Sequence, residues 1–441
     1  MRPLSPLLLA VAPALVSVAA AQASGQTSGQ TSGQTSGQTL GQPSALKAWK
    51  PLGGAVHTGE TMNPSLAEGE RGLLLCAYQD LELSGRGSTA VFNVMTGDWQ
   101  PVGTPGGASS GRDWWPKIAF GPNSEVYRIN YDYGLGARLG FRRLEVDPQL
   151  GPIWTLPLGS ELSTGEAHTP DIELGAGNRP IVSFQDGPGG NTLSQSQGGI
   201  TVLRIDMATG QSTALGGAGF SDAFVPAGQR SSVWHTQVEL APDGEIFAAW
   251  DERWDGHINH QLHVARYSEA SDEWTLLGAP GLGQGAGGVH LNLQLLPSGI
   301  PVVAYRGQSP RALRVQRWVP ETTEWVQIGG DVAVDEFAAQ TGDVGFSSDA
   351  GYRESVPFVI DDEGRMFIAC RAHDASGHLR LKTWEFKNGE WQPMGALGGF
   401  LPGSGEEDYA HLIAVGGRLP VISCRRSPNE PGEEIVVHGF F

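Results

Sequence analysis

The sequence predicts an all-β protein, a seven-bladed β-propeller in which each blade is a four-stranded antiparallel sheet. A closing motif of Trp, two residues, an aliphatic residue and Gly, with one extra residue allowed, recurs at intervals of roughly 50–65 residues. Glycine (63 residues) and proline (29) are spread evenly and no long helical periodicity is present, as in a meander with many turns. Because a lone four-stranded sheet cannot cover both faces, such units stack radially until the ring closes. The motif occurs at 49–53, 99–103, 154–159, 274–278, 325–329 and 391–395, with a copy lacking Trp at 212–216.

Residues 235–278 show the pattern of one blade. Two short apolar segments are joined by Pro-Asp-Gly at 242–244, and the second segment ends at Trp250. After a polar loop, a third segment ends at Tyr267 and a fourth begins at Trp274. Short aliphatic and aromatic runs bounded by Gly, Pro, Asp and Ser are typical of strands, and Asp-Gly suits a tight hairpin. Each repeat therefore predicts four consecutive antiparallel strands.

Residues 1–21 have the pattern of a secretory signal peptide. One cation, Arg2, precedes an apolar run over 7–18, and Ala19-Ala20-Ala21 resembles a cleavage site. The run is too short to span a bilayer, so we expect no transmembrane segment in the mature chain. Cleavage near Gln22 would leave a protein that is secreted, periplasmic or held at the cell surface.

Residues 22–45 form a predicted flexible linker, and residues 46–441 form the predicted propeller. The linker contains four copies of Ser-Gly-Gln-Thr, which offer nothing to bury against the loss of chain entropy. The final blade has only three strands of its own, the last over 435–441. We therefore expect the N-terminal segment 49–53 to supply the fourth strand and to close the ring by backbone hydrogen bonds. We expect a monomer.

The chain carries a formal net charge of −18, from 47 acidic and 29 basic residues. This balance disfavours nucleic acid and anionic membranes as partners. Three cysteines, an odd number for an exported chain, provide no disulfide framework. Cys370 and Cys424 occupy equivalent positions in successive blades, so the cysteines are either small buried apolar side chains or these two form a bond.

Aligning the blades on the turn glycine places two sets of residues at one end of the ring, the channel mouth. The loop entering the first strand and the loop leaving the second open on the same face, so these positions form two rings around the channel. The first ring is Asn63, Trp115, Thr169, His235, His290, Ser355 and Tyr409. The second ring, just past the second strand, is Gln79, Tyr131, Gln185, Asp251, Arg306, Arg371 and Arg425.

Arg306, Arg371 and Arg425 occupy one position in three successive blades of an acidic chain. Guanidinium groups bind carboxylates and sulfates through two parallel hydrogen bonds, so the three arginines indicate an anion site at the channel mouth. Alternatively, each arginine pairs with a nearby carboxylate and only closes the loops. The carboxylates near these positions are Glu354, Glu407 and Asp408.

Tryptophans flank the same positions. Trp114 and Trp115, with Trp234 and Trp254, would offer flat apolar faces on which sugars stack. The alternative for each is packing between blades, which is the role expected of Trp250 at the end of a second strand.

Histidines from three successive blades, His168, His235 and His290, fall at nearly one level of the mouth. Imidazoles there could ligate a metal or act as acid or base, oriented by Asp251 or Asp255, and Tyr409 is a further candidate for acid or base. Equally, these histidines could be structural.

The blade-four loop contains His257-x-x-His260, a short spacing that leaves open a structural or catalytic divalent metal. No fixed-spacing motif such as His-Glu-x-x-His is present, so no cofactor is predicted.

Two segments, Ser271-Asp272-Glu273-Trp274 and Gly97-Asp98-Trp99, match the ends of the repeat Ser-x-Asp-x-Gly-x-x-Trp, of which no full copy is present. In this, residues 46–441 resemble the secreted bacterial β-propellers built from sialidase-like (BNR) repeats. Where sialidases carry Arg-Ile-Pro, this chain offers Arg128-Ile129-Asn130, which does not predict sialidase activity. Seven blades are similar instead to some polysaccharide lyases, a likeness of architecture.

Two functions fit these residues. The first is an exported, non-catalytic module that binds an acidic glycan or another anionic ligand at the channel mouth. The second is a polysaccharide lyase or glycoside hydrolase, in which arginines neutralise a uronate carboxylate and His235, His290 or Tyr409 moves a proton. A protein–protein interaction scaffold is a further alternative. The sequence favours binding, because it predicts an anion site and lacks a catalytic motif.

Overall fold

A computed structural model describes most of the chain from Lys47 onward. The described residues are 47–121, 123–158, 162–163, 165–175, 177–187, 198–227, 229, 231–254, 260–279, 282, 288–307, 312–332, 355–395, 398–403, 406–427 and 433–441. The predicted signal peptide and linker lie outside them. No helix in the described ranges is long and apolar enough to cross a membrane.

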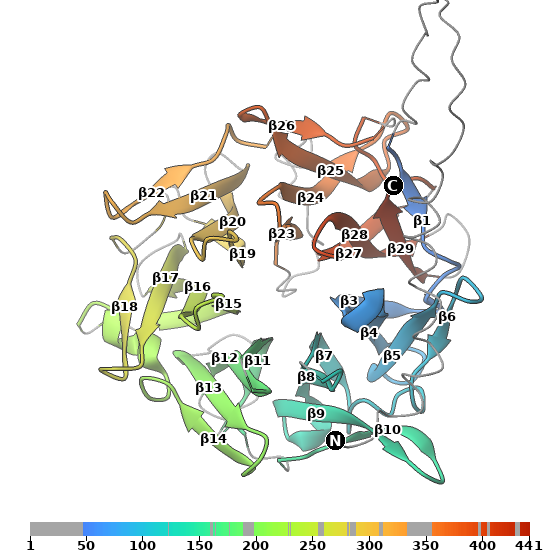
Figure 1. Ribbon diagram of the computed structural model, residues 1–441, viewed down its shortest axis with the longest axis horizontal. Helices are drawn as coiled ribbons and strands as arrows, with labels where there is room; N and C mark the ends of the chain where they lie inside the picture. The colour runs from blue at the N-terminus through green and yellow to red at the C-terminus, as the bar shows by residue number, and fades with distance from the viewer. Residues whose placement is uncertain are drawn as a thin grey trace, which may run out of the picture.

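The predicted seven-bladed propeller is confirmed: seven antiparallel sheets surround a central axis, each with its first strand innermost (Figure 1). Blade one is β3 (Thr61–Glu68), β4 (Leu74–Asp80), β5 (Arg86–Asn93) and β6 (Asp98–Pro101); blade two is β7 (Asp113–Phe120), β8 (Val126–Asp132), β9 (Arg138–Asp147) and β10 (Gly151–Thr155). Blade three is β11 (Ala167–Gly175), β12 (Arg179–Asp186), β13 (Ile200–Asp206) and β14 (Gln211–Ala214); blade four is β15 (Ser231–Leu240), β16 (Ile246–Trp254), β17 (Gln261–Ser268) and β18 (Glu273–Leu276).

The remaining blades follow the same order. Blade five is β19 (Gly288–Leu295), β20 (Pro301–Gly307), β21 (Leu313–Val319) and β22 (Glu324–Gln327); blade six is β23 (Phe358–Ile360), β24 (Met366–His373), β25 (Leu379–Lys387) and β26 (Glu390–Pro393). Blade seven has β27 (Glu406–Val415), β28 (Leu419–Ser427) and β29 (Glu434–Phe440). Short 3₁₀ turns are η1 (Glu70–Gly72), η2 (Tyr133–Leu135) and η3 (Phe220–Phe224).

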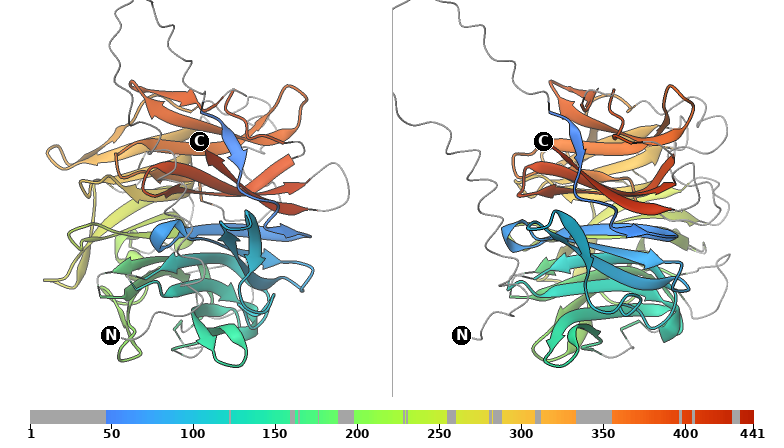
Figure 2. Two further views of the ribbon diagram at one scale, coloured as in Figure 1. Left: turned by 45° about the vertical axis from the view of Figure 1, so that its right-hand side comes forward. Right: turned by 90° about the vertical axis from the view of Figure 1, so that its right-hand side faces the viewer.

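The N-terminal segment completes the last sheet, as predicted. β1 (Trp49–Pro51) pairs antiparallel with β29, with Trp49 opposite Phe440. β2 (His57–Thr58) pairs with the beginning of the same strand, with His57 opposite Ile435. Figure 2 shows β1 beside the strand that ends the chain. The two ends of the propeller therefore share one sheet, which leaves no open edge at the closure.

The closing motif has a physical role, because its Trp and Gly join successive blades. The indole N–H of Trp99 donates to the Leu52 carbonyl at 2.9 Å, immediately before Gly53. Gly53 has a φ of 76°, a conformation that side-chain-bearing residues rarely adopt. The same hydrogen bond recurs from Trp274 to Leu215 (2.8 Å), from Trp325 to Leu277 (2.7 Å) and from Trp391 to Ile328 (3.1 Å).

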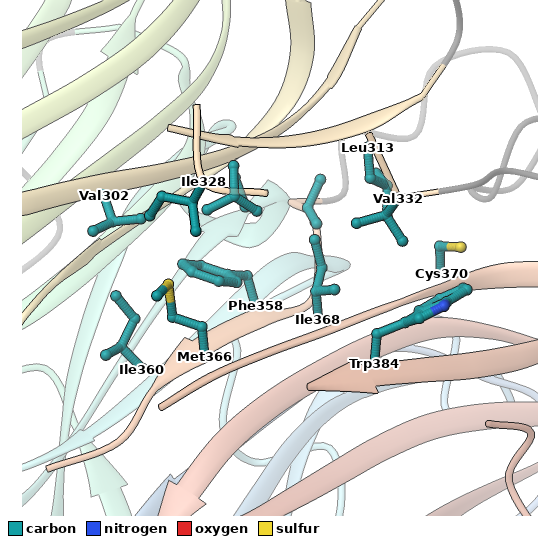
Figure 3. Packing of buried hydrophobic residues seen from close by; sticks show 13 residues of the cluster. Val302, Leu313, Ile328, Val332, Phe358, Ile360, Met366, Ile368, Cys370 and Trp384 are labelled. Carbon is teal, nitrogen blue, oxygen red and sulfur yellow. The ribbon is translucent and has the colours of Figure 1, made fainter. Parts of the chain in front are cut away.

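The hydrophobic core lies between the blades. Successive side chains of a strand point to opposite faces, so each second strand packs against both neighbouring blades. Between blades five and six, for example, Val302 packs with Phe358 (Figure 3). Cys370 belongs to this cluster, whereas Cys424 is buried between blades six and seven. No disulfide joins these cysteines, which serve as small buried side chains.

Candidate functional site

A cavity lies at the centre of the ring. Six of the seven residues of the predicted first ring line it: Asn63, Trp115, Thr169, His235, Ser355 and Tyr409. Ten further lining residues were not predicted, and five of them stand two positions beyond a first-ring residue: Ser65, Lys117, Asn292, Pro357 and His411. The period-two alternation of strands could have found them, because it returns every second side chain to the same face.

A repeated β-bulge turns the first-ring residues toward the channel. In blade two the register shifts between Trp114 and Lys117, and Trp115 has a φ of 49°. In blade seven it shifts between Asp408 and His411, and Tyr409 has a φ of 47°. Positive φ in bulky residues is uncommon and clusters at functional sites, and bulges re-aim side chains. The same conformation occurs at Asn63, Thr169 and His290.

The second ring lies at the level of the first, as the alignment predicted. In blade five Arg306 pairs across the sheet with Val289, which precedes first-ring residue His290. In blade seven Arg425 pairs in the same way with Asp408. The first strand of blade six is shorter than predicted, because β23 begins at Phe358 rather than at Ser355.

His235 and Asp251 form a buried pair in blade four. The Nδ1 atom of His235 lies 3.0 Å from each Asp251 oxygen, and its backbone N–H donates to Oδ1 at 2.8 Å. Burial would raise the pKa of Asp251, but the charges of His235, His260 and His290 and the His235 hydrogen bond lower it to about 2. The aspartate is therefore ionised at neutral pH and accepts the Nδ1 proton of His235.

The second nitrogen of His235 is buried in a side chain that lines the cavity. His235 is only 3% exposed and lines the cavity, and its Nε2 atom has no hydrogen-bond partner among the described residues. Buried polar atoms are normally satisfied, so such an atom requires an explanation. With Nδ1 protonated toward Asp251, Nε2 carries a lone pair and can accept a proton.

The other histidines surround this pair. The rings of His290 and His235 lie 4.9 Å apart, and His260 Nδ1 lies 3.7 Å from Asp251 Oδ2. His260 therefore belongs beside the dyad. Its proposed metal-binding partner, His257, lies outside the described residues.

The three second-ring arginines differ in their surroundings. The Arg425 guanidinium lies 4.4 Å from the centroid of the Tyr409 ring and pairs with Glu433 at 3.2 Å. Arg371 is only 7% exposed, and no hydrogen bond or ion pair ties it to another described residue. Ala369, two residues earlier, packs toward blade seven, so the alternation of β24 turns Arg371 the same way. A buried guanidinium without a counter-ion among the described residues favours an anionic ligand.

The carboxylates considered as partners of these arginines are used differently. Glu407 is buried and pairs with Arg426 at 2.8 Å and with Arg380 at 3.8 Å. It therefore joins blades six and seven. Glu354 lies outside the described residues, as does the side chain of Asp408.

Trp115, Tyr131 and His168 form an aromatic cluster, called the aromatic wall, in blades two and three. Trp115 is 9% exposed, and its ring lies 5.8 Å from Tyr131 and 5.9 Å from His168. The buried His168 stacks on Tyr131 at 4.6 Å and contacts Glu166 through Nε2 at 3.0 Å. Trp115 thus packs between blades and also lines the cavity, and its stacking on a sugar stays a prediction.

The remaining tryptophans contact charged or aromatic side chains of the protein. The Arg112 guanidinium lies over Trp114, 4.5 Å from the ring centroid, and Trp234 lies 5.1 Å from the His260 ring. Trp254 donates to the buried Glu252. Trp250 is fully buried, as predicted.

No family model matches the sequence, and neither does any curated protein. Solved structures do match. An ulvan lyase superposes with a TM-score of 0.56 at 12% identity, covering 87% of this chain and 94% of the lyase. An oligogalacturonate lyase from Vibrio parahaemolyticus gives 0.54 at 9% identity, with coverages of 89% and 96%.

A puromycin hydrolase also matches, with a TM-score of 0.55 at 16% identity over 87% of this chain. This chain spans about half of that enzyme, 53% of its length. At these identities the matches show the propeller fold alone, shared by lyases and hydrolases of different chemistry.

Proposed function

We propose that this protein binds an acidic polysaccharide at the channel mouth and cleaves it by β-elimination. The observation that carries the proposal is the buried His235–Asp251 pair on the cavity wall, in which Asp251 holds Nδ1 and Nε2 has no hydrogen-bond partner among the described residues. A non-catalytic binding module would need the arginines and the aromatic wall. Such a module would not require a buried His–Asp pair on the cavity wall.

The proposed reaction assigns a role to each group. Arg371, with Arg306 and Arg425 in the same ring, neutralises the uronate carboxylate and so acidifies the neighbouring C5–H bond. His235 Nε2 takes the C5 proton, and Asp251 stabilises the imidazolium that forms. The electron pair of the C5–H bond forms the C4–C5 double bond while the C4–O bond breaks. The leaving oxygen takes a proton from Tyr409, which lines the same cavity.

The structural neighbours support the choice of substrate class. The ulvan lyase with a TM-score of 0.56 is also known bound to GlcA(1-4)Rha3S, a uronate-containing oligosaccharide. For this chain the proposal is limited to polymers that contain a uronate. Because such polymers occur outside the cytoplasm, the proposal includes export by the N-terminal signal segment.

The test is to incubate the purified protein with a panel of uronate polysaccharides and to follow the absorbance of the unsaturated product. A neutral polysaccharide serves as the control. We expect absorbance to rise with at least one uronate polymer and not with the neutral one. New reducing ends without absorbance would indicate a hydrolase, and salt-sensitive binding without cleavage would indicate a binding module.

A further inference from the structure

Three potential metal ligands meet where the closing segment passes blade one, outside the central cavity. His57 lies in β2, on the sheet of blade seven, whereas Asp80 ends β4 of blade one and Glu82 lies in the following turn. One ligand atom from each residue lies within 4.8 Å of the other two. His57 Nε2 is 3.8 Å from Asp80 Oδ2 and 3.8 Å from Glu82 Oε2.

The imidazole is placed as a ligand rather than as a hydrogen-bond donor. A separation of 3.8 Å exceeds a hydrogen bond, and His57 Nε2 is buried with no hydrogen-bond partner in the described part of the chain. The His57 ring packs on Tyr78 with centroids 5.4 Å apart, which fixes its orientation. Nε2 therefore points at two carboxylates without bonding to either.

Asp80 is held in place, and Glu82 lies in a space left by a glycine. Asp80 is 2% exposed, and its oxygens accept hydrogen bonds from the Leu83 backbone at 3.2 Å and from the Ser88 hydroxyl at 3.4 Å. Such outer contacts orient metal-binding carboxylates. The Glu82 carboxyl lies against Gly59, where an added Cβ would come within 2.5 Å of its carbon. Glycine at this position leaves room for the acid beside His57.

We propose that His57, Asp80 and Glu82 bind one Zn²⁺ ion that fastens the ring closure. One imidazole nitrogen and two carboxylate oxygens, completed by water, form a common zinc ligand set. Zinc bonds of about 2.0–2.2 Å require the three side chains to draw together only slightly. The ion would link β2 of blade seven to blade one. Because metal binding to the folded state adds to its stability, zinc should strengthen the closure.

The test is zinc titration of the metal-stripped full chain by calorimetry, together with thermal unfolding with and without zinc. We expect one zinc per chain and an unfolding temperature that rises with zinc. His57→Ala and Glu82→Gln should each weaken zinc binding roughly tenfold or more, equivalent to about 1.4 kcal/mol. Gly59→Ala should also weaken it by displacing Glu82.

The matched control is His378→Ala, because that imidazole lies 3.9 Å from a single carboxylate, Asp374. Zinc affinity should be unchanged in this variant. Loss of the Tyr78 contact could lower the unfolding temperature of His57→Ala with or without zinc, so the decisive quantity is the zinc-dependent increment. Absence of zinc binding, or equal affinity in the wild type, His57→Ala and Glu82→Gln, would overturn the proposal.

Discussion

Blades two and four both bury charged groups near the channel mouth, but they partner them differently. In blade two the fully buried Arg128 pairs with Asp113 and donates to the Tyr78 carbonyl of blade one at 3.3 Å. In blade four Asp251 holds one nitrogen of His235, and the other has no partner among the described residues. The first arrangement joins neighbouring blades, whereas the second leaves an unpartnered nitrogen in a residue that lines the cavity. Under the proposed function, equivalent regions of the repeat serve structure in one blade and chemistry in another.

The largest expected effect is on catalysis. His235→Gln should lower kcat/KM for a uronate polymer by about 10²–10⁴-fold, because a positioned general base contributes that much. The Gln amide can donate to Asp251 in place of His235 Nδ1, so the buried aspartate keeps a hydrogen bond and most of the stability should remain. His378→Gln, at an exposed position, is the control. Equal loss of activity in both variants would remove the distinction between the blades.

The next effect is on the stability of blade two. Arg128→Met should lower the free energy of unfolding by about 3–5 kcal/mol, because it leaves Asp113 buried without its counter-ion. Arg142 pairs with Asp132 at 2.8 Å. Arg142→Met should lower the free energy of unfolding by less, because Asp132 keeps hydrogen bonds from the backbone of Ser110, Gly111 and Gly134. Urea denaturation of both variants measures the difference. Equal losses would mean that the blade-two pair does not have the assigned role.

The sequence predicts the blade count, the closure and the level of the two rings, because a fixed closing motif sets the register of every blade. It also brings His235 and Asp251 together, since both positions follow from one alignment. It does not predict contacts that arrive from other blades. The Tyr78 carbonyl that Arg128 meets lies 50 residues away in sequence. Trp115 is likewise more buried than a sugar platform requires, because Tyr131 and His168 pack against it.

A third prediction concerns how the stability of blade four depends on pH. Burial lowers the pKa of His263 to about 4, partly opposed by the charge of Asp251. The unfolded value is about 6.5, so the stability contributed by neutral His263 is present above that pH and is lost as the pH falls toward 4. Protonation of His263 should lower the free energy of unfolding by about 3 kcal/mol over that pH window. Asp251 has a pKa of about 2, so the stability that its ionised form contributes is lost only at lower pH.

The measurement is urea denaturation across that window for the wild type and for His263→Phe, which keeps a ring stacked on Trp250. The variant should lose less stability on acidification. An identical slope in both proteins would contradict a neutral buried His263.

The smallest predicted effect concerns the anion site. Arg371→Ala should weaken binding of a uronate oligosaccharide roughly tenfold or more, because hydrogen bonds to charged groups contribute about 1.5–3 kcal/mol. Binding should also fall with added salt. Arg314→Ala is the control. Arg314 lies on β21 and pairs with Asp331, so its loss should leave this binding unchanged. Salt-independent affinity, unchanged in Arg371→Ala, would contradict an anion site.

The central claim is that His235 removes a proton from the uronate ring. A uronate oligosaccharide carrying deuterium at C5 tests it most directly, with mass spectrometry of the products. The account predicts slower cleavage of the deuterated substrate, an unsaturated product without the deuterium, and no incorporation of water. A product that retains the deuterium and gains one water molecule would contradict β-elimination at this site.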